Sequence, residues 1–144
     1  MRFIIGMVLM LASFLGAYFI EGGDPLTLVG ITPFLIVFFI PLISTIAVWE
    51  IKDISAAFSN ALGKGVLKGT LRKSGLVLDF LENIFYASGI LGLLTGLILV
   101  LSNITVMEKL GFSIAVSLLS MIYGILFGIT THVLRARIEE KKEL

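Results

Sequence analysis

Two of the apolar stretches of this 144-residue chain carry rows of hydroxyl-bearing and glycine residues at helical spacing. Residues three and four positions apart share one face of a helix, so each row would form one smooth, weakly polar stripe. Such stripes suit close packing of membrane helices, and they also suit the lining of a narrow passage or of a slot for another helix. Both interpretations stay open, and they are compatible. The rows are Ser88, Gly89, Gly92, Thr95, Gly96 and Ser102, and Ser113, Ser117, Ser120, Gly124, Gly128 and Thr131.

The same stretches lack the side chains that usually carry protons. No Asp, Glu, Lys or Arg lies at the centre of any apolar stretch. Ionisable side chains inside a bilayer are costly and usually mark ion or proton pathways. The single histidine, His132, lies near the end of its stretch, and we interpret it as an interfacial residue, with a relay role as the weaker alternative. If the chain conducts ions, a partner must supply the titrating group.

Other chemistry has little support in the sequence. The chain has no cysteine, which excludes disulfides and thiolate metal sites. The single histidine has no acid near it in its stretch, and no metal-ligand spacing is present, so we expect neither an enzyme nor a metal or cofactor site. Gly63-Lys64-Gly65 lacks the frame of a phosphate-binding loop. A net charge of +1 gives no reason to expect a nucleic-acid partner.

The composition places these residues in a membrane. The mean hydropathy is +1.08, with 58% hydrophobic and only 15% charged residues, whereas a soluble domain is about a quarter charged. Crossing a bilayer takes about 20 apolar residues, and four stretches without charge meet that length. The sequence therefore predicts an all-α, polytopic membrane protein with four transmembrane helices in a single membrane domain, 1–144. The predicted spans are 3–20, 28–49, 84–103 and 110–134.

The first span is the shortest of the four and has one alternative. A secretory signal would have Arg2 as its basic end and Phe3–Phe14 as its apolar core. No convincing small-x-small cleavage site followed by a mature domain is present. We therefore predict a retained span.

The basic residues predict the orientation, because cytoplasmic loops are enriched in Lys and Arg. With four spans, one side of the membrane carries nearly all of them, and the other side carries only Lys109. Both termini and the loop 50–82 are therefore predicted to be cytoplasmic. The residues on that side are Arg2, Lys52, Lys64, Lys68, Arg72, Lys73, Arg135, Arg137, Lys141 and Lys142.

Local patterns predict how the spans are connected. Pro33 and Pro41 should bend the second span, and the bent part should pack against protein. An amphipathic helix over 51–62 should continue from that span until Gly63 and Gly65 break it. The basic stretch 66–81 should lie at the lipid headgroups, or alternatively dock a soluble partner. The tail 135–144 should be a solvated helix end.

Three stretches resemble one known family, the MotA/TolQ/ExbB proton-channel subunits. Gly16–Gly23, with Leu28 and Pro33 beyond it, resembles the end of the first span of MotA, its double glycine and the proline that follows. Gly89–Ile98 is similar to the pattern G-I-I-G-T-V-x-G-L in span three. Leu110–Gly124 is similar to the span-four run L-G-x-x-I-A-V-A-L-L-T-T-x-Y-G, and this match is the most specific. Four spans favour the MotA branch, since TolQ and ExbB look like three-span proteins.

The resemblance implies an ion-driven rotary motor in the cytoplasmic (inner) membrane of a bacterium. Such subunits form a homopentamer around two copies of a single-span partner of the MotB/ExbD/TolR type, which carries one intramembrane aspartate. By this resemblance, hydroxyls would face that carboxylate and glycines would allow its helix to approach. The implied partner-facing residues are Thr95, Ser117 and Ser120, then Gly92, Gly96 and Gly124, and beside them Ser88 and Ser113.

The sequence departs from the family pattern at several places. Leu93 replaces a threonine, which by analogy favours protons over sodium, and Met121 replaces a second threonine. Tyr86 stands where the family has a proline. The loop between spans two and three is much shorter than in MotA, so a flagellar torque role is in question. Two other classes stay open: a non-conducting membrane scaffold or assembly protein, and a small proton-coupled transporter.

Overall fold

A computed structural model describes residues 2–63, 70–102 and 107–143, and these residues are almost entirely helical. Four of the helical segments are long and apolar enough to cross a membrane. The predicted all-α class with four transmembrane helices is therefore confirmed, whereas the pentamer stays a prediction. In chain order the helices are α1 (Arg2–Ile20), the 3-10 helix η1 (Pro25–Leu28), α2 (Ile31–Val48), α3 (Ile51–Leu62), α4 (Leu71–Ser102) and α5 (Met107–Glu143).

The chain divides into two compact units, Met1–Ile31 and Thr32–Leu144. In the first unit, α1 ends at a turn formed by Glu21 and Gly22. Gly22 has a φ of 81°, a left-handed conformation that glycine adopts without the clash of a Cβ atom. Asp24 then caps η1, because its Oδ1 accepts a hydrogen bond from the backbone N–H of Leu26 at 3.0 Å. The Tyr18 hydroxyl lies 2.7 Å from Thr27 Oγ1 and ties the turn to α1.

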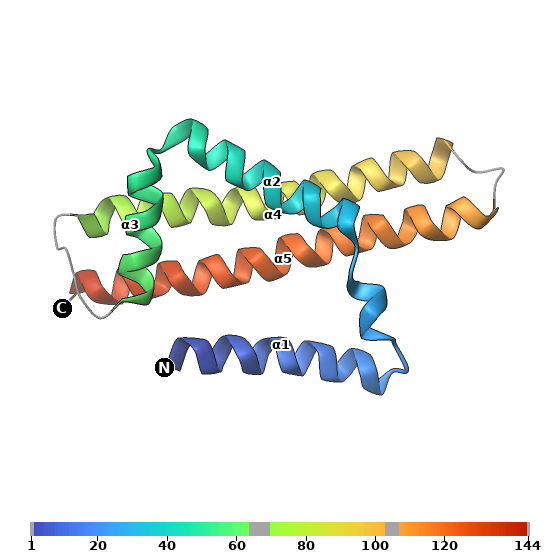
Figure 1. The fold of residues 1–144 in the computed structure, drawn as a ribbon, viewed down its shortest axis with the longest axis horizontal. Helices are drawn as coiled ribbons and strands as arrows, with labels where there is room; N and C mark the ends of the chain where they lie inside the picture. The colour runs from blue at the N-terminus through green and yellow to red at the C-terminus, as the bar shows by residue number, and fades with distance from the viewer. Residues whose placement is uncertain (1, 64–69, 103–106, 144) are drawn as a thin grey trace. The chain divides into compact units, whose positions relative to one another are not determined.

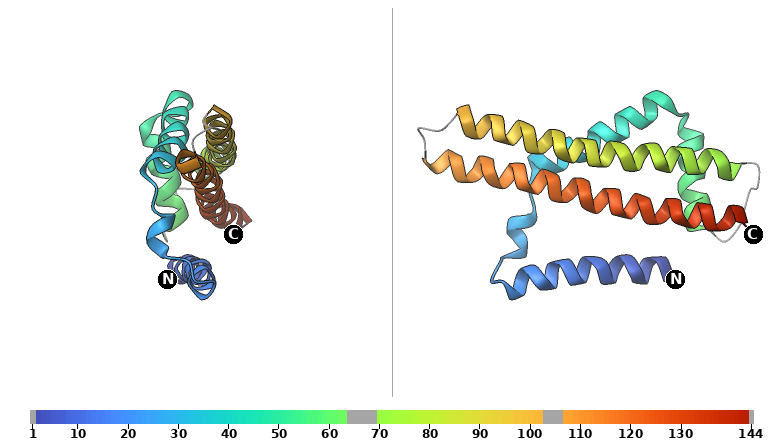
Figure 2. Two further views of the ribbon diagram at one scale, coloured as in Figure 1. Left: turned by 90° about the vertical axis from the view of Figure 1, so that its right-hand side faces the viewer. Right: turned by 180° about the vertical axis from the view of Figure 1, so that it is seen from behind.

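The second unit is built on an antiparallel hairpin of two long helices. Figures 1 and 2 show α4 and α5 side by side along most of their length. At about 1.5 Å per residue, both exceed the roughly 30 Å of a hydrocarbon core, since α4 has 32 residues and α5 has 37. Their surplus length lies at one end of the hairpin, where Lys73, Asp79, Arg135 and Lys141 gather. We call this end the charged end.

The helix α2 crosses the hairpin, and only one of its two prolines lies in its interior. Pro33 lies in the first turn, where backbone N–H groups have no partner in the helix, so this proline does not bend it and that part of the prediction is wrong. Pro41 is inside the helix and cannot donate to the carbonyl of Val37. The Ser88 hydroxyl of α4 lies 3.4 Å from that carbonyl oxygen, and Pro41 is buried. The predicted packing of this part against protein is confirmed.

Ser88 is therefore expected to stabilise the crossing of α2 over α4. The Ser88 hydroxyl donates to the carbonyl of Phe85 on its own helix at 2.9 Å and lies 3.4 Å from the Val37 carbonyl, so Ser88→Ala should lower stability by about 1 kcal/mol or less, the usual size of polar contacts between membrane helices. Thermal unfolding in mild detergent measures the loss, with the exposed Ser55→Ala as a control. Equal melting temperatures for the two variants would contradict this role of Ser88.

Aromatic rings fill the contact between α2 and the hairpin. Phe34 and Phe38 of α2 meet Phe127 of α5 with ring centroids 6.3 Å apart in both cases. Phe127 stacks on Phe85 of α4 at 5.3 Å. Offset and edge-on aromatic pairs of this kind add directional contact to the apolar packing. One aromatic layer thus joins three helices around Val37, which is fully buried.

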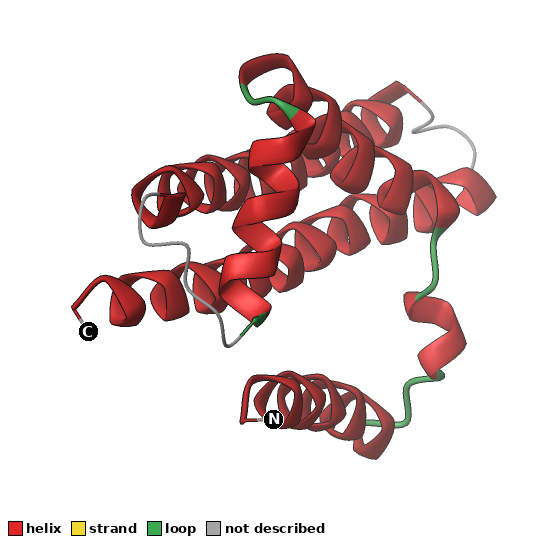
Figure 3. Ribbon diagram, turned by 60° about the vertical axis from the view of Figure 1, so that its left-hand side comes forward, coloured by secondary structure: helices red, strands yellow, loops and turns green. Residues whose placement is uncertain are grey.

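The helix α3 is separate from α2, although the sequence predicted a continuation. The chain turns at Trp49 and Glu50, and Glu50 has an extended backbone (ψ 146°). Figure 3 shows α3 lying across the charged end of the hairpin. Its amphipathic character and its end before Gly63 are confirmed. Asp53 of α3 pairs with Lys73 of α4 at 2.6 Å, which fixes one side of the crossing.

Two further polar contacts hold the other end of α3. Asn60, buried in α3, donates from Nδ2 to Ser74 Oγ of α4 at 3.0 Å. Lys141 of α5 donates from Nζ to the backbone oxygens of Asn60 and Gly63, both at 2.5 Å. The last carbonyls of a helix have no partner within it, so this lysine acts as a cap from another helix.

These contacts bear on two predictions about the cytoplasmic segments. Residues 71–81 are the first turns of α4, with Val77 and Leu78 fully buried, so this stretch is continuous with the third span, and its position at the lipid headgroups stays a prediction. Residues 66–69 of the same predicted stretch, like Gly65, lie outside the described residues. The tail is helical as predicted, but it is not simply solvated, because Ile138 is fully buried and Lys141 caps α3.

Candidate functional site

The two stripes of small residues meet each other inside one chain. Glycines of α4 face serines or a glycine of α5, and each pair lies too close for a side chain on the glycine. A Cβ atom on Gly92 would lie 2.5 Å from Ser120 Cβ, and one on Gly96 would lie 2.8 Å from Ser117 Cα. A Cβ on Gly89 would lie 3.0 Å from the Cα of Gly124. Small residues at such spacing let two membrane helices approach closely, so close packing within the chain explains both stripes.

The hydroxyls in this contact are buried and bonded to their own helix. Ser117 donates to the carbonyl of Ser113 at 2.7 Å, and Ser120 donates to that of Val116 at 2.9 Å. Ser117 and Ser120 are 1% and 0% exposed. A buried hydroxyl without a partner would be costly in an apolar environment. These bonds remove that cost and leave the hydroxyls between α4 and α5.

The structure therefore separates the eight sequence-predicted residues into two groups. Thr95 is exposed and donates only to the carbonyl of Leu91, at 2.8 Å. It is the one residue of the set that a second chain can reach directly. The assignment of the set to a partner stays a prediction. The buried members are Ser88, Gly92 and Gly96 of α4, and Ser113, Ser117, Ser120 and Gly124 of α5.

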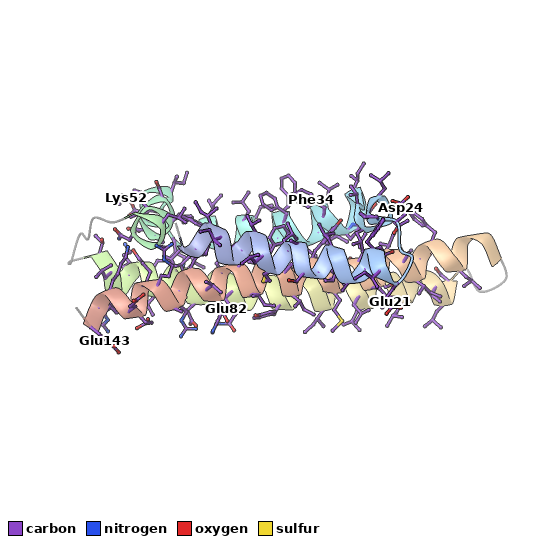
Figure 4. All side chains as sticks on the ribbon, turned by 90° about the horizontal axis from the view of Figure 1, so that it is seen from below. Glu21, Asp24, Phe34, Lys52, Glu82 and Glu143 are labelled. Carbon is purple, nitrogen blue, oxygen red and sulfur yellow. The ribbon has the colours of Figure 1, made fainter. Side chains whose placement is uncertain are left out.

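The hairpin has two different faces. One face packs against α2 through the aromatic layer. The other carries Tyr86, Ile90, Met121 and Ile125, which line a shallow groove of about 190 Å³ together with Gly89. Figure 4 shows Glu82 at the edge of the hairpin away from Phe34 of α2. We call the face with this groove and Glu82 the open face.

A cluster of charged residues lies on the open face at the charged end, and the sequence did not reveal it. Glu82 Oε1 of α4 lies 2.8 Å from His132 Nδ1 of α5. Arg135 of α5 pairs with Asp79 of α4 at 2.5 Å and lies 3.5 Å from Glu82 Oε2. The Glu82 side chain is only 11% exposed, against 61% for His132. The only histidine of the chain thus has an acid partner on the neighbouring helix, although its own stretch contains none.

One signal in the sequence points to this cluster. Glu82 comes directly before an uncharged stretch, and His132 lies near the end of the next one. Consecutive spans joined by a short loop are antiparallel neighbours, so the start of one lies beside the end of the other. The pairing of Glu82 with His132 follows from that arrangement, but only once the relative rotation of the two helices is known.

An apolar cavity of about 260 Å³ lies on the opposite face, where α2 diverges from the hairpin. Phe38 and Leu42 of α2, Phe58 of α3 and Phe127 of α5 contribute to its walls, and its only polar side chains are threonines. Among the described residues, no group of histidines and acids could hold a metal ion. The charged chemistry of the described chain is therefore concentrated at the charged end.

The fold and this site define a class: a multi-pass membrane subunit in which a tightly packed hairpin carries its ionisable groups at one end. Comparison with family models gives the particular assignment. The model of the MotA/TolQ/ExbB proton channel family matches residues 52–143, which is more than half of the chain and includes α3, α4 and α5. The chain therefore belongs to this family and is a subunit of the ion-channel type. Searches of curated proteins and of solved structures gave no significant match.

Proposed function

We propose that this chain is the channel subunit of a proton-driven rotary motor, converting ion motive force into mechanical work with a single-span partner. The observation that carries the proposal is the family match across α3, α4 and α5. In this assembly five copies of the chain surround two partner helices of the MotB/ExbD/TolR type. The chain itself performs no catalysis.

The distribution of charge supports the need for a partner. The four spans carry no Asp, Glu, Lys or Arg at their centres, so the chain supplies no titrating group at mid-membrane. A proton cannot cross the hydrocarbon without such a group or a chain of water. An aspartate on the partner's helix would supply the titrating group at mid-membrane. The exposed Thr95 hydroxyl is the group of this chain that meets it most directly.

The packing of α4 against α5 also favours a second candidate, a non-conducting scaffold. The small residues and the buried hydroxyls have a complete structural explanation within one chain, namely the close approach at Gly92 and Gly96. A scaffold would need nothing more from them. The two candidates differ in one observable respect, because a scaffold has no need of a partner with an intramembrane acid.

Co-purification followed by mass measurement of the intact complex tests the proposal. The chain is extracted in mild detergent from cells that express it with the neighbouring genes. We expect five copies of the 15.7 kDa chain with two copies of a single-span protein that has an aspartate in its span. A monomer or dimer without such a protein would refute the motor and favour the scaffold.

The proposed orientation places both termini and α3 in the cytoplasm of a bacterium, with the chain in its inner membrane. The chain has no cysteine, so single-cysteine variants report position without background. We expect Ser55→Cys in α3 and Lys142→Cys in α5 to react with a membrane-impermeant thiol reagent only after the inner membrane is opened. Thr27→Cys in η1 should react in intact spheroplasts. The reverse pattern would contradict the orientation.

A further inference from the structure

We infer that Glu82 and His132 form a protonation site at the cytoplasmic end of the conduction path, where protons leave the membrane. The inference rests on the proposed function and adds to it a proton-accepting group on this chain. The Glu82 carboxylate and the His132 ring are 2.8 Å apart, within hydrogen-bond distance. At that distance one proton can pass directly between the oxygen and the nitrogen.

The identity of the residue opposite Glu82 favours proton exchange over a purely structural ion pair. A permanent cation, Arg135, already joins α4 and α5 by pairing with Asp79 at 2.5 Å. A second structural ion pair between the helices would be strongest with lysine or arginine opposite Glu82, because these side chains stay charged at physiological pH. Position 132 instead carries histidine, the side chain whose unperturbed charge changes between pH 5 and 8. This residue type is suited to gaining and losing a proton under physiological conditions.

The charges around Glu82 leave it available for exchange. The groups facing it are His132 and Arg135 from α5, and Asp79 and Tyr86 from α4. Arg135 lies 2.5 Å from Asp79 but 3.5 Å from Glu82, so its stronger bond is to Asp79. The closest partner of Glu82 is therefore the histidine. Lys73, which is also at the charged end, is paired with Asp53 of α3.

The exposure of the two side chains indicates which of them exchanges protons with water. Glu82 is 11% exposed and lies on the open face, at the inner edge of the charged end (Figure 4), whereas His132 is 61% exposed. A proton that reaches the pair from the membrane side protonates the Glu82 carboxylate. It passes from Oε1 to Nδ1 of the neutral His132 ring, and the resulting imidazolium releases one proton to water. One proton enters and one leaves, and both side chains return to their starting forms.

A titration of the full chain in lipid vesicles tests the coupling without any measurement of flux. The single histidine gives one set of ring-nitrogen NMR signals, and protonation of the carboxyl group is followed by infrared absorption. We expect the histidine transition to depend on the carboxyl group at position 82, because interacting groups titrate as a pair. Glu82→Gln should remove the carboxyl change and alter the histidine transition. Glu139→Gln, which removes an exposed partner of Lys142, should alter neither.

An unchanged histidine transition in Glu82→Gln would overturn the inference. A flux measurement on the assembled complex then tests the role of the pair. We expect Glu82→Gln and His132→Gln each to lower proton flux toward the cytoplasmic side about tenfold or more, the lower range of general acid–base effects, with Glu139→Gln unchanged. Glu82→Asp should restore part of the flux and of its dependence on cytoplasmic pH.

The possible results separate this inference from the proposed function. Native flux in Glu82→Gln and His132→Gln would mean that the pair is only a structural clamp, and it would overturn this inference alone. If Glu82→Gln does not fold, Glu82→Asp and His132→Gln carry the test. A native complex that passes no protons would refute the proposed function, and this inference with it.

Discussion

Gly124→Ala is expected to separate α4 from α5 and to lower the stability of the protein by about 1–3 kcal/mol, the usual range for overpacking. The new Cβ atom would lie 2.7 Å from the Cα of Gly89 and 2.9 Å from the carbonyl oxygen of Phe85. Both neighbours are backbone atoms, so no side-chain rotation relieves the contact. The two helices must move apart, and the aromatic layer around Phe127 moves with them.

Gly111→Ala is the matched control for this prediction. Gly111 lies on the same helix, and a Cβ atom there would meet nothing within 4 Å. Alanine favours a helix over glycine by about 1 kcal/mol, so this variant should be as stable as the parent or slightly more so. Thermal unfolding in one detergent compares the two variants. Equal melting temperatures for Gly124→Ala and Gly111→Ala would contradict the close packing of α4 against α5 at Gly124.

Lys141→Met is expected to release the end of α3 from the hairpin. The substitution keeps the length of the side chain but removes two hydrogen bonds to the backbone oxygens of Asn60 and Gly63. Hydrogen bonds that involve a charged group contribute about 1.5–3 kcal/mol, and each 1.4 kcal/mol corresponds to about tenfold in an equilibrium. Amide hydrogen exchange in the last turn of α3 should therefore rise tenfold or more.

Lys142→Met provides the comparison for Lys141. Lys142 pairs with Glu139 on its own helix, and the Glu139 side chain is about half exposed. Exposed ion pairs contribute only about 0–1 kcal/mol, so exchange in α3 should change little. Equal exchange rates in the two variants would show that Lys141 does not hold α3. Hydrogen exchange is preferred to a melting curve here because it reports on α3 separately.

The sequence was sufficient to predict which residues share a face but not what that face meets. The spacing of Gly92 and Gly96 on one helix, and of Ser117 and Ser120 on the other, correctly grouped the residues that lie at one contact. Periodicity contains no information about the neighbour. A stripe that packs on the next span and a stripe that lines a channel have the same composition, because both need small, weakly polar side chains.

Charged residues at the ends of spans were the second part that the sequence could not resolve. Basic residues such as Lys73 favoured a position at the lipid headgroups for the stretch before span three, but they did not show which helices these charges contact. In the structure, Lys73 pairs with Asp53 of α3, and Asp79 pairs with Arg135 of α5. Their charges are satisfied by other helices, so the segment continues as α4. Pairing of this kind depends on tertiary contacts that no local pattern contains, and the same reason concealed the contact of Glu82 with His132.

Proton flux with and without the partner is the most direct test of the central claim. The claim is that this family member conducts protons only together with a single-span partner whose helix carries an aspartate. The purified chain, and the purified complex, are placed in vesicles that contain a pH-sensitive dye, and a proton gradient is applied. The complex should dissipate the gradient, whereas the chain alone, or the complex with the partner's aspartate changed to asparagine, should not. Equal flux through the chain alone and through the complex would contradict the claim.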